Sequence, residues 1–297
     1  MEKSLDNVLR YALRVGAVDL ILSEGFAPAV RIAGRVQVIP GAETLAFGDL
    51  EKFLGPLAGE SGQFVGGPWQ NTEWRVRHSR EAFGKMAVLR PIGADAPTLS
   101  DLSIPEAVKN ILSEDSGLIV FAGPAVSGKT TTASAFVSDA CNEKILRVSL
   151  LDPLPEYKIR TGKSLVRGKR SEVSFEEEIR QGVLAGTDLF WLGDYHGNYL
   201  FPALRAAASG ARVVTTFAAG SAHDVLSYLV ADGSLQNERL ARSLLAANLR
   251  AVIVQNWTLS EDGASLVPAW DVLENDFRVS ALIDSGEWEK IFESPRS

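Results

Sequence analysis

The sequence predicts an α/β protein in which a smaller α+β domain precedes a larger domain built on a mostly parallel sheet. Up to about residue 92 the chain reads as short helices and strand pairs, whereas from about residue 100 apolar runs of strand length alternate with helical segments. In addition, a glycine-rich loop at 123–130 connects the first of these runs to a helix. We therefore expect an N-terminal domain over 1–92, a linker over 93–103 and a second domain over 104–297.

The N-terminal domain is expected to begin with an amphipathic helix, because apolar residues recur there at helical spacing. These residues are Leu5, Val8, Leu9, Ala12 and Leu13. A strand follows at 18–22, and 29–40 reads as a strand pair that folds at Ala33-Gly34-Arg35. The remaining elements expected in this domain are a short helix within 47–59 and a second strand pair at 73–80 and 85–92. The segment 91–105 is rich in Pro, Asp and Ser, as a linker requires.

The second domain is expected to contain a sheet whose strands are buried on both faces, because its apolar runs are nearly continuous. These runs are SGLIVFAG (116–123), ILRVSLLD (145–152), TDLFWLGD (187–194) and ARVVTTFA (211–218). Toward the C-terminus we expect a strand pair from 244–257 and 266–273, followed by a last helix near 275–286.

The composition is that of a folded protein. Hydrophobic residues make up 46% and charged residues 23% of the chain, which excludes disorder. The net charge is −7 and no run of Lys and Arg stands out, so we expect no nucleic-acid partner.

The single cysteine, Cys141, excludes an intrachain disulfide and is typical of a reducing cytoplasm. No stretch reaches the roughly 18 uncharged apolar residues of a membrane span, so we expect no membrane insertion.

The glycine-rich loop GPAVSGKT at 123–130 matches the pattern of a phosphate-binding loop, with a strand before it and a helix after it. Backbone N–H groups in such a loop point into one hollow, and the helix N-terminus adds partial positive charge. Lys129 is expected to reach the terminal phosphates, and the Thr130 hydroxyl to ligate Mg²⁺. The sequence therefore predicts that the loop binds ATP together with Mg²⁺. The residues expected to bind it are Gly123, Val126, Ser127, Gly128, Lys129, Thr130 and Thr131.

The metal also needs an acidic ligand at the end of a neighbouring strand. Asp194 ends the apolar run 187–194, and ligands of open α/β sheets gather at the carboxyl ends of strands. We therefore expect Asp194 to hold Mg²⁺ and to take part in catalysis. The alternative is a surface aspartate that caps the next helix.

Six segments in order along nearly the whole chain resemble the PilT-like ATPases of type IV pilus retraction, twitching motility and type II secretion. They are VDLILSEGFAPAVRIAGRV, the approach to GPAVSGKTTT, LLDPLPEY, LFWLGDYHG, VTTFAAGSAHDVL and LLAANLRAVIVQNWTLSEDGASLVPAWDVL. This resemblance implies a PAS-like N-terminal domain, a RecA-like ATPase domain and a homo-hexamer or a ring mixed with another secretion ATPase. It also implies a cytoplasmic location, peripheral to the inner membrane on a platform protein.

The resemblance further implies that arginines of the N-terminal domain contact the phosphates. Arg75, Arg77 and Arg90 match these positions. Alternating arginines on a strand could equally form a solvated face. In LLDPLPEY, Asp152 and Glu156 are the carboxylates available to orient the attacking water, although Asp152 before a proline could simply end its strand.

The sequence departs from the family pattern at groups that would carry hydrolysis. Leu151 replaces a glutamate, Ala218 stands at the position of a histidine, and Asp194 is shorter by one methylene than the usual glutamate. His196 takes an arginine position, and His223 lies five residues beyond Ala218. Loss of a base or water-positioning carboxylate costs roughly 100- to 10,000-fold in rate. We therefore expect ATP binding with slow or absent hydrolysis.

Two other functions stay open from the sequence. The chain could be a non-hydrolysing adaptor that keeps the ATP-bound fold and regulates a pilus or secretion machine. It could also be a small-molecule kinase, with the basic stretch 158–172 as its lid, although this leaves the N-terminal domain without a role.

Overall fold

The computed structural model describes residues 2–32, 35–57, 60–93, 95–113, 115–168, 173–195, 197, 199–231, 237–260 and 266–293. The chain folds as two compact units. The first comprises Met1–Ala94 together with Leu154–Lys158, and the second comprises Asp95–Pro153 and Ile159–Ser297. The short segment 154–158 therefore leaves the second unit and packs into the first. The domain limits expected from the sequence stay a proposal.

The first unit contains a six-stranded antiparallel sheet in the order β3-β2-β1-β6-β5-β4. Its helices are α1 (Glu2–Arg14) and α2 (Asp49–Leu54). Its strands are β1 (Asp19–Ser23), β2 (Ala29–Ile32), β3 (Arg35–Val38), β4 (Ser61–Trp69), β5 (Thr72–Glu81) and β6 (Gly84–Pro91).

The core of the first unit lies between α1 and one face of this sheet. Leu5, Val8, Leu9 and Ala12 of α1 are buried against sheet residues that include Trp74, as the helical spacing predicted. The sequence analysis missed β4, because glycine and proline interrupt its apolar pattern. The turn expected at Ala33-Gly34 lies outside the described residues.

The second unit contains a seven-stranded sheet in the order β13-β12-β7-β11-β10-β8-β9. All neighbouring strands in it are parallel except β12 and β13. The strands are β7 (Gly117–Ala122), β8 (Arg147–Leu150), β9 (Leu165–Gly168), β10 (Leu189–Asp194), β11 (Arg212–Phe217), β12 (Leu249–Leu259) and β13 (Leu266–Glu274). The prediction of a mostly parallel sheet is confirmed.

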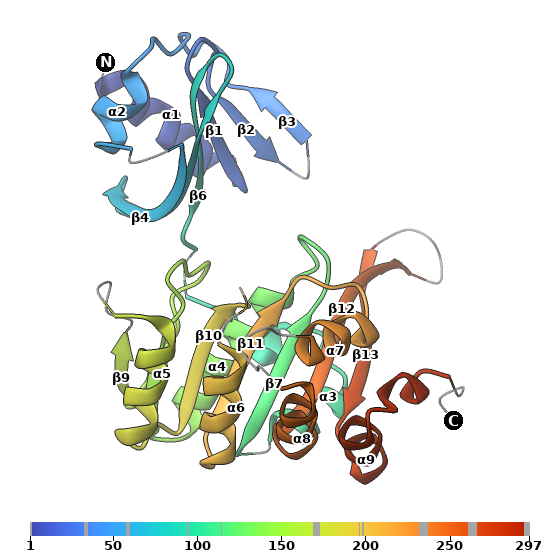
Figure 1. The fold of residues 1–297 in the computed structure, drawn as a ribbon. Coiled ribbons are helices and arrows are strands. Elements are labelled where there is room, and N and C mark those ends of the chain that lie inside the picture. The colour runs from blue at the N-terminus through green and yellow to red at the C-terminus, as the bar shows by residue number, and fades with distance from the viewer. Residues whose placement is uncertain are drawn as a thin grey trace. The chain divides into compact units, whose positions relative to one another are not determined.

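Helices cover both faces of the second sheet, as its continuous apolar strands require (Figure 1). On one face lie α3 (Glu106–Leu112) and α4 (Lys129–Glu143), preceded by the short 3-10 helix η1 (Leu99–Asp101). The other face carries α5 (Phe175–Leu184), α6 (Leu200–Ala208), α7 (Ala222–Val230), α8 (Glu238–Asn248), α9 (Phe277–Ser285) and the 3-10 helix η2 (Trp288–Ile291).

The strand order corrects one expectation about the metal-binding carboxylate. The sequence analysis placed Asp194 at the end of a strand next to the strand of the glycine-rich loop, and this is wrong. Strand β11 lies between β7 and β10 (Figure 1). Because the three strands are parallel, their carboxyl ends still lie along one edge of the sheet.

The basic stretch 158–172 contains a strand that the sequence analysis missed. Its residues Leu165–Gly168 form β9, which pairs in parallel with β8 at the sheet edge. Residues 169–172 lie outside the described part of the chain. Within the described residues, no helix has the length and apolar character needed to span a bilayer.

Close packing of α5 on β10 depends on a glycine. A Cβ atom at Gly182 would lie 2.4 Å from Cε1 of Phe190. In Gly182→Ala, overpacking should cost about 1–3 kcal/mol. The better helix propensity of alanine returns at most about 1 kcal/mol, so we expect a net loss of stability. Urea unfolding followed by circular dichroism measures this. Gly220→Ala is the control, since no atom lies within 4 Å of its Cβ position. Equal stability of the two variants would contradict the prediction.

Candidate nucleotide-binding site

The glycine-rich loop connects the end of β7 to the first residue of α4, as predicted. Gly128 precedes this helix with φ 92°, in the left-handed region that favours glycine. A Cβ atom at Gly123 would lie 2.3 Å from Ser127 Oγ and 2.4 Å from the Gln255 carbonyl oxygen. At Gly128 it would lie 2.8 Å from Gln255 Nε2. Gly123 is therefore required by the close approach of the β12 backbone, and Gly128 by its left-handed conformation.

Hydrogen-bond donors converge inside this loop. Lys129 Nζ donates to the Pro124 carbonyl at 3.5 Å, and the Ser127 N–H donates to the same oxygen at 3.3 Å. The Ser127 hydroxyl is buried and has no hydrogen-bond partner among the described residues. An anion with several oxygens would accept from all three groups and from the N-terminus of α4. The residues present therefore fit a phosphate chain.

Lys129 carries a charge that the described protein does not neutralise. Its residue is only 9% exposed, yet within the described residues no carboxylate oxygen lies within 4.0 Å of its ammonium. A buried ammonium is costly unless it is paired. An anionic ligand would supply the missing partner.

Two aspartates lie together at the carboxyl ends of β8 and β10. Thr216 Oγ1 of β11 donates to Asp194 Oδ1 at 2.5 Å, and the Tyr199 hydroxyl donates to the Asp194 carbonyl at 2.9 Å. Asp152 packs against the neighbouring backbone, because a Cβ atom at Gly193 would lie 2.5 Å from its Cγ. Asp194 does not cap the following helix, since the N-cap of α6 is Tyr199.

Glu156, the other carboxylate expected to act in catalysis, lies in the first unit with two of the predicted arginines. Its Oε1 is 3.3 Å from Arg75 Nη1 and 3.3 Å from Arg90 Nη1. The segment is also fixed through its backbone, because the Gly93 N–H donates to the Glu156 carbonyl at 2.9 Å. Glu156 and Asp152 therefore belong to different units, although they are close in the sequence.

A second carboxylate extends this ion-pair cluster. Arg90 Nε lies 2.9 Å from Asp19 Oδ1, and Arg31 Nε lies 3.1 Å from Asp19 Oδ2. Burial by itself lowers the pKa of Arg90, but the hydrogen bond and charge of Asp19, together with Glu156, outweigh it and raise that pKa. Arg77 is exposed and donates to Gln63 Oε1 at 3.3 Å. Arg75 and Arg90 are therefore held in a cluster, and Arg77 is not part of it.

The positions that depart from the family pattern have ordinary packing roles. Leu151 is fully buried in the core between the sheet and α5–α9. Ala218 is exposed after β11. The His223 ring lies in α7, 5.3 Å from the ring of Trp288 and 5.2 Å from that of Phe292. His196 lies outside the described residues.

The sequence analysis missed three side chains at the loop and the carboxyl edge. They are Thr216, Gln255 and Trp257. For Thr216, the sequence did carry a signal, because a hydroxyl within an otherwise apolar strand indicates a polar contact at that position. Nothing in the local sequence indicated that β12 would lie beside the glycine-rich loop.

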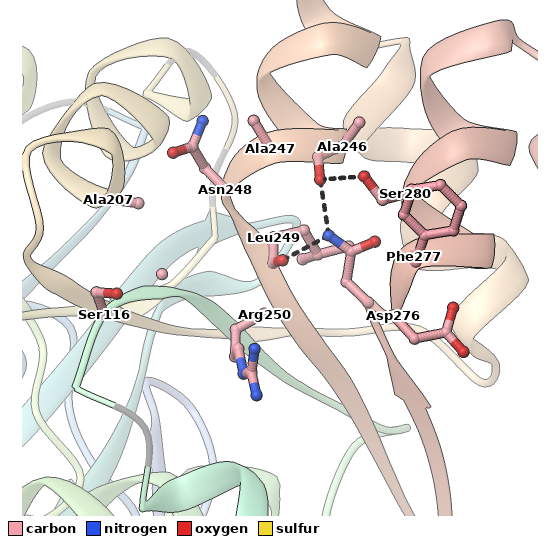
Figure 2. A pocket seen from close by; sticks show the side chains of 12 residues that line it. Ser116, Ala207, Ala246, Ala247, Asn248, Leu249, Arg250, Asp276, Phe277 and Ser280 are labelled. Carbon is pink, nitrogen blue, oxygen red and sulfur yellow. Dashed lines mark hydrogen bonds between the residues drawn. The ribbon is translucent and has the colours of Figure 1, made fainter.

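A cavity of about 350 Å³ lies near Ser116 and Gly117, at the start of β7, whereas the glycine-rich loop follows the other end of this strand. Figure 2 shows the side chains that line the cavity. Asn275 Nδ2 donates to the carbonyls of Ala246 and Leu249 at 2.8 Å each. Ser280 Oγ donates to the Ala246 carbonyl at 2.8 Å. These hydrogen bonds connect the end of α8 to the start of α9. The cavity therefore lies beside a packing contact between two helices and is separate from the candidate site.

Comparison with known proteins identifies the family. A family model described as "Type II/IV secretion system protein" matches residues 69–262, about two thirds of the chain. The chain belongs to this family. The resemblance inferred from the sequence is thereby confirmed.

Similar proteins of this secretion family cover almost the whole chain. The Pseudomonas aeruginosa type IV pilus retraction ATPase PilT is 24% identical over 91% of this chain and 82% of its own. The type IV pilus ATPase PilU from the same organism is 23% identical over 95% and 77%. A crystal structure of the pilus retraction motor PilT with bound ADP superposes with a TM-score of 0.80 at 24% identity, covering 97% of this chain and 88% of that one. The expected two-part architecture is therefore confirmed at the level of the fold.

The surroundings of Cys141 predict an unreactive thiol. Cys141 lies on the buried face of α4. Burial raises the pKa of its thiol, and the hydrogen bond with Ser164 offsets this rise only in part. A raised pKa leaves less thiolate at a given pH. We expect the native protein at pH 8 to react with a disulfide reagent about 100-fold more slowly than the urea-unfolded chain. Cys141→Ala gives the background rate, and equal rates in the native and unfolded states would contradict the assignment.

Proposed function

We propose that this chain binds Mg-ATP in the glycine-rich loop and acts as a slow ATPase subunit of a type IV pilus or type II secretion machine. The observation that carries the proposal is the buried Lys129 ammonium, which has no carboxylate partner among the described residues. Membership of the secretion family and the names of its pilus relatives support the assignment.

The loop residues would hold the phosphates by the chemistry of their donors. Backbone N–H groups of the loop and the Lys129 ammonium would bind the phosphate oxygens. This assignment covers Gly123, Val126, Ser127, Gly128, Lys129, Thr130 and Thr131. The Thr130 hydroxyl and the Asp194 carboxylate are oxygen donors of the kind that suits Mg²⁺. When bound, Mg²⁺ would neutralise charge on the phosphates.

Slow hydrolysis follows from the carboxylates available. Asp152 packs against Gly193, the residue before Asp194, and this supports assigning to it the orientation of a water at this edge. Glu156 could act only after leaving Arg75 and Arg90, to which it is bound in this structure. Leu151, in place of a glutamate, is buried and cannot act on water. Loss of a general base costs roughly 100- to 10,000-fold in rate.

The arginines of the first unit are the second part of the proposal. Arg75 and Arg90 present guanidinium groups to a single carboxylate oxygen, an arrangement that also suits a phosphate oxygen. We propose that they, and the exposed Arg77, contact the nucleotide phosphates in the assembled machine. Supporting this, Arg77 is exposed, and a guanidinium offers five N–H donors in a planar fork that matches phosphate oxygens.

Assembly is proposed from the relatives. We infer a homo-hexamer, or a ring mixed with another secretion ATPase, at the cytoplasmic face of the inner membrane with a platform protein as its partner. The alternative is a non-hydrolysing, ATP-binding adaptor of such a machine. The buried Leu151 and the exposed Ala218, which replace chemically active groups, favour this alternative.

Mg-ATP binding by calorimetry, paired with steady-state phosphate release, tests the proposal. We expect the wild type to bind, with slow release of phosphate. Lys129→Ala should weaken binding by about 10- to 100-fold, because a charge-assisted hydrogen bond is lost. Lys109→Ala on the exposed face of α3 is the control, since its ammonium pairs with Glu106 at 3.1 Å.

Three outcomes separate the two functions. Slow turnover that Lys129→Ala abolishes identifies a working ATPase. Binding without turnover, even at protein concentrations where rings form, identifies the adaptor. Absence of Mg-ATP binding by the wild type would refute both.

A second prediction concerns the metal. Thr216→Val removes the hydroxyl that donates to Asp194 Oδ1. We expect affinity for Mg-ATP to fall about 3- to 10-fold, and affinity for ATP in EDTA to stay unchanged, because only the metal ligand is misplaced. Thr215→Val is the control, since its hydroxyl donates to the Gly193 carbonyl at 2.9 Å. An equal loss with and without Mg²⁺ would remove Asp194 from the metal site.

A further inference from the structure

Strand β12 carries two side chains that contact the glycine-rich loop from outside. Trp257 Nε1 donates to the Val126 carbonyl at 3.1 Å. Gln255 Oε1 accepts from Thr132 Oγ1 at 2.8 Å. We propose that Trp257 is a positioning residue that holds the glycine-rich loop in its phosphate-binding shape, with Gln255 supporting the base of the loop. This inference rests on the proposed binding of nucleotide to that loop.

The loop contains a conformation that needs support. Val126 has φ 66°, in the left-handed region that β-branched residues rarely adopt. Its own side chain gives little support, because the residue is 81% exposed. A conformation of this kind persists only where surrounding contacts impose it. The hydrogen bond from Trp257 is such a contact, and it acts on Val126 itself.

Fixing the Val126 carbonyl also orients the next amide. The carbonyl of Val126 and the N–H of Ser127 belong to one planar trans peptide, so they point in opposite directions. With the carbonyl turned toward Trp257, the Ser127 N–H points toward the Pro124 carbonyl, to which it donates at 3.3 Å. Lys129 Nζ donates to that same oxygen at 3.5 Å. Trp257 thus aims one backbone donor at the place that Lys129 also reaches.

Gln255 lies two residues before Trp257, so the alternation of a strand puts both side chains on the same face. Gln255 is almost fully buried, and its backbone carbonyl approaches Gly123 so closely that a Cβ atom there would clash, while its side-chain amide lies against Gly128. Strand β12 therefore contacts the base of the loop through Gln255 and its tip through Trp257.

Trp257 is 49% exposed, so burial of its ring does not fully explain a tryptophan there. A second tryptophan provides a matched comparison. Trp270 lies on β13 in register with Gln255, and its Nε1 is buried without a hydrogen-bond partner among the described residues. Replacing either indole by phenylalanine removes an N–H group, but only at Trp257 does this break a bond to the loop.

The experiment compares Trp257→Phe and Trp270→Phe with the wild type. Calorimetry gives the Kd for Mg-ADP, thermal unfolding gives Tm, and tryptophan emission is recorded during the Mg-ADP titration. We expect Trp257→Phe to weaken binding by about 3- to 10-fold, as loss of one hydrogen bond should, with a Tm close to that of the wild type. Trp270→Phe should retain the wild-type Kd. The wild type and Trp270→Phe should show an emission change that Trp257→Phe lacks.

Unchanged affinity in Trp257→Phe would overturn the positioning role. An equal loss of affinity in both variants would also overturn it, because the effect would then be general destabilisation. If the wild type binds neither Mg-ADP nor Mg-ATP, the proposed function is refuted, and hydrogen exchange of peptide 123–131 then tests whether Trp257 holds the loop. Faster exchange in Trp257→Phe alone would support the proposal that Trp257 stabilises the loop conformation. Equal exchange in all three proteins would exclude it.

Discussion

The placement of the Lys129 ammonium is the constraint on which the rest of the second unit depends. Lys129 begins α4, is almost buried, and has no carboxylate partner among the described residues. A buried charge of this kind needs an anion. Gly123 leaves room for the backbone of Gln255 beside the loop, and Gly128 lies against the side-chain amide of the same residue. Strand β12 is thus as much a part of the binding loop as the motif residues themselves.

The order of the strands explains how the acidic edge is organised. Asp194 lies one strand further from the loop than expected, with β11 in between. Thr216 of that intervening strand donates to Asp194 and so connects the two sides of the edge. Asp152, from the strand beyond β10, packs against the backbone at Gly193. Three neighbouring strands therefore contribute polar groups to one place, which a parallel sheet makes possible.

The segment 154–158 shows how the two units are coupled through the chain itself. It follows Asp152 and Pro153 of the second unit directly, yet it packs within the first unit. Glu156 is bound there by Arg75 and Arg90. Asp152 and Glu156 are only four residues apart in the chain, yet they belong to different units.

The sequence by itself determined the features that local patterns control. The glycine-rich loop, the start of α4 at Lys129, the buried strands and the amphipathic α1 all follow from spacing within a few residues of one another. Only the tertiary structure decided which strands adjoin. Strand β11 lies between β7 and β10, two arginines bind Glu156, and Trp257 donates to Val126. Each of these contacts joins residues far apart in the chain. Such contacts depend on the packing of whole elements, and no local pattern encodes them.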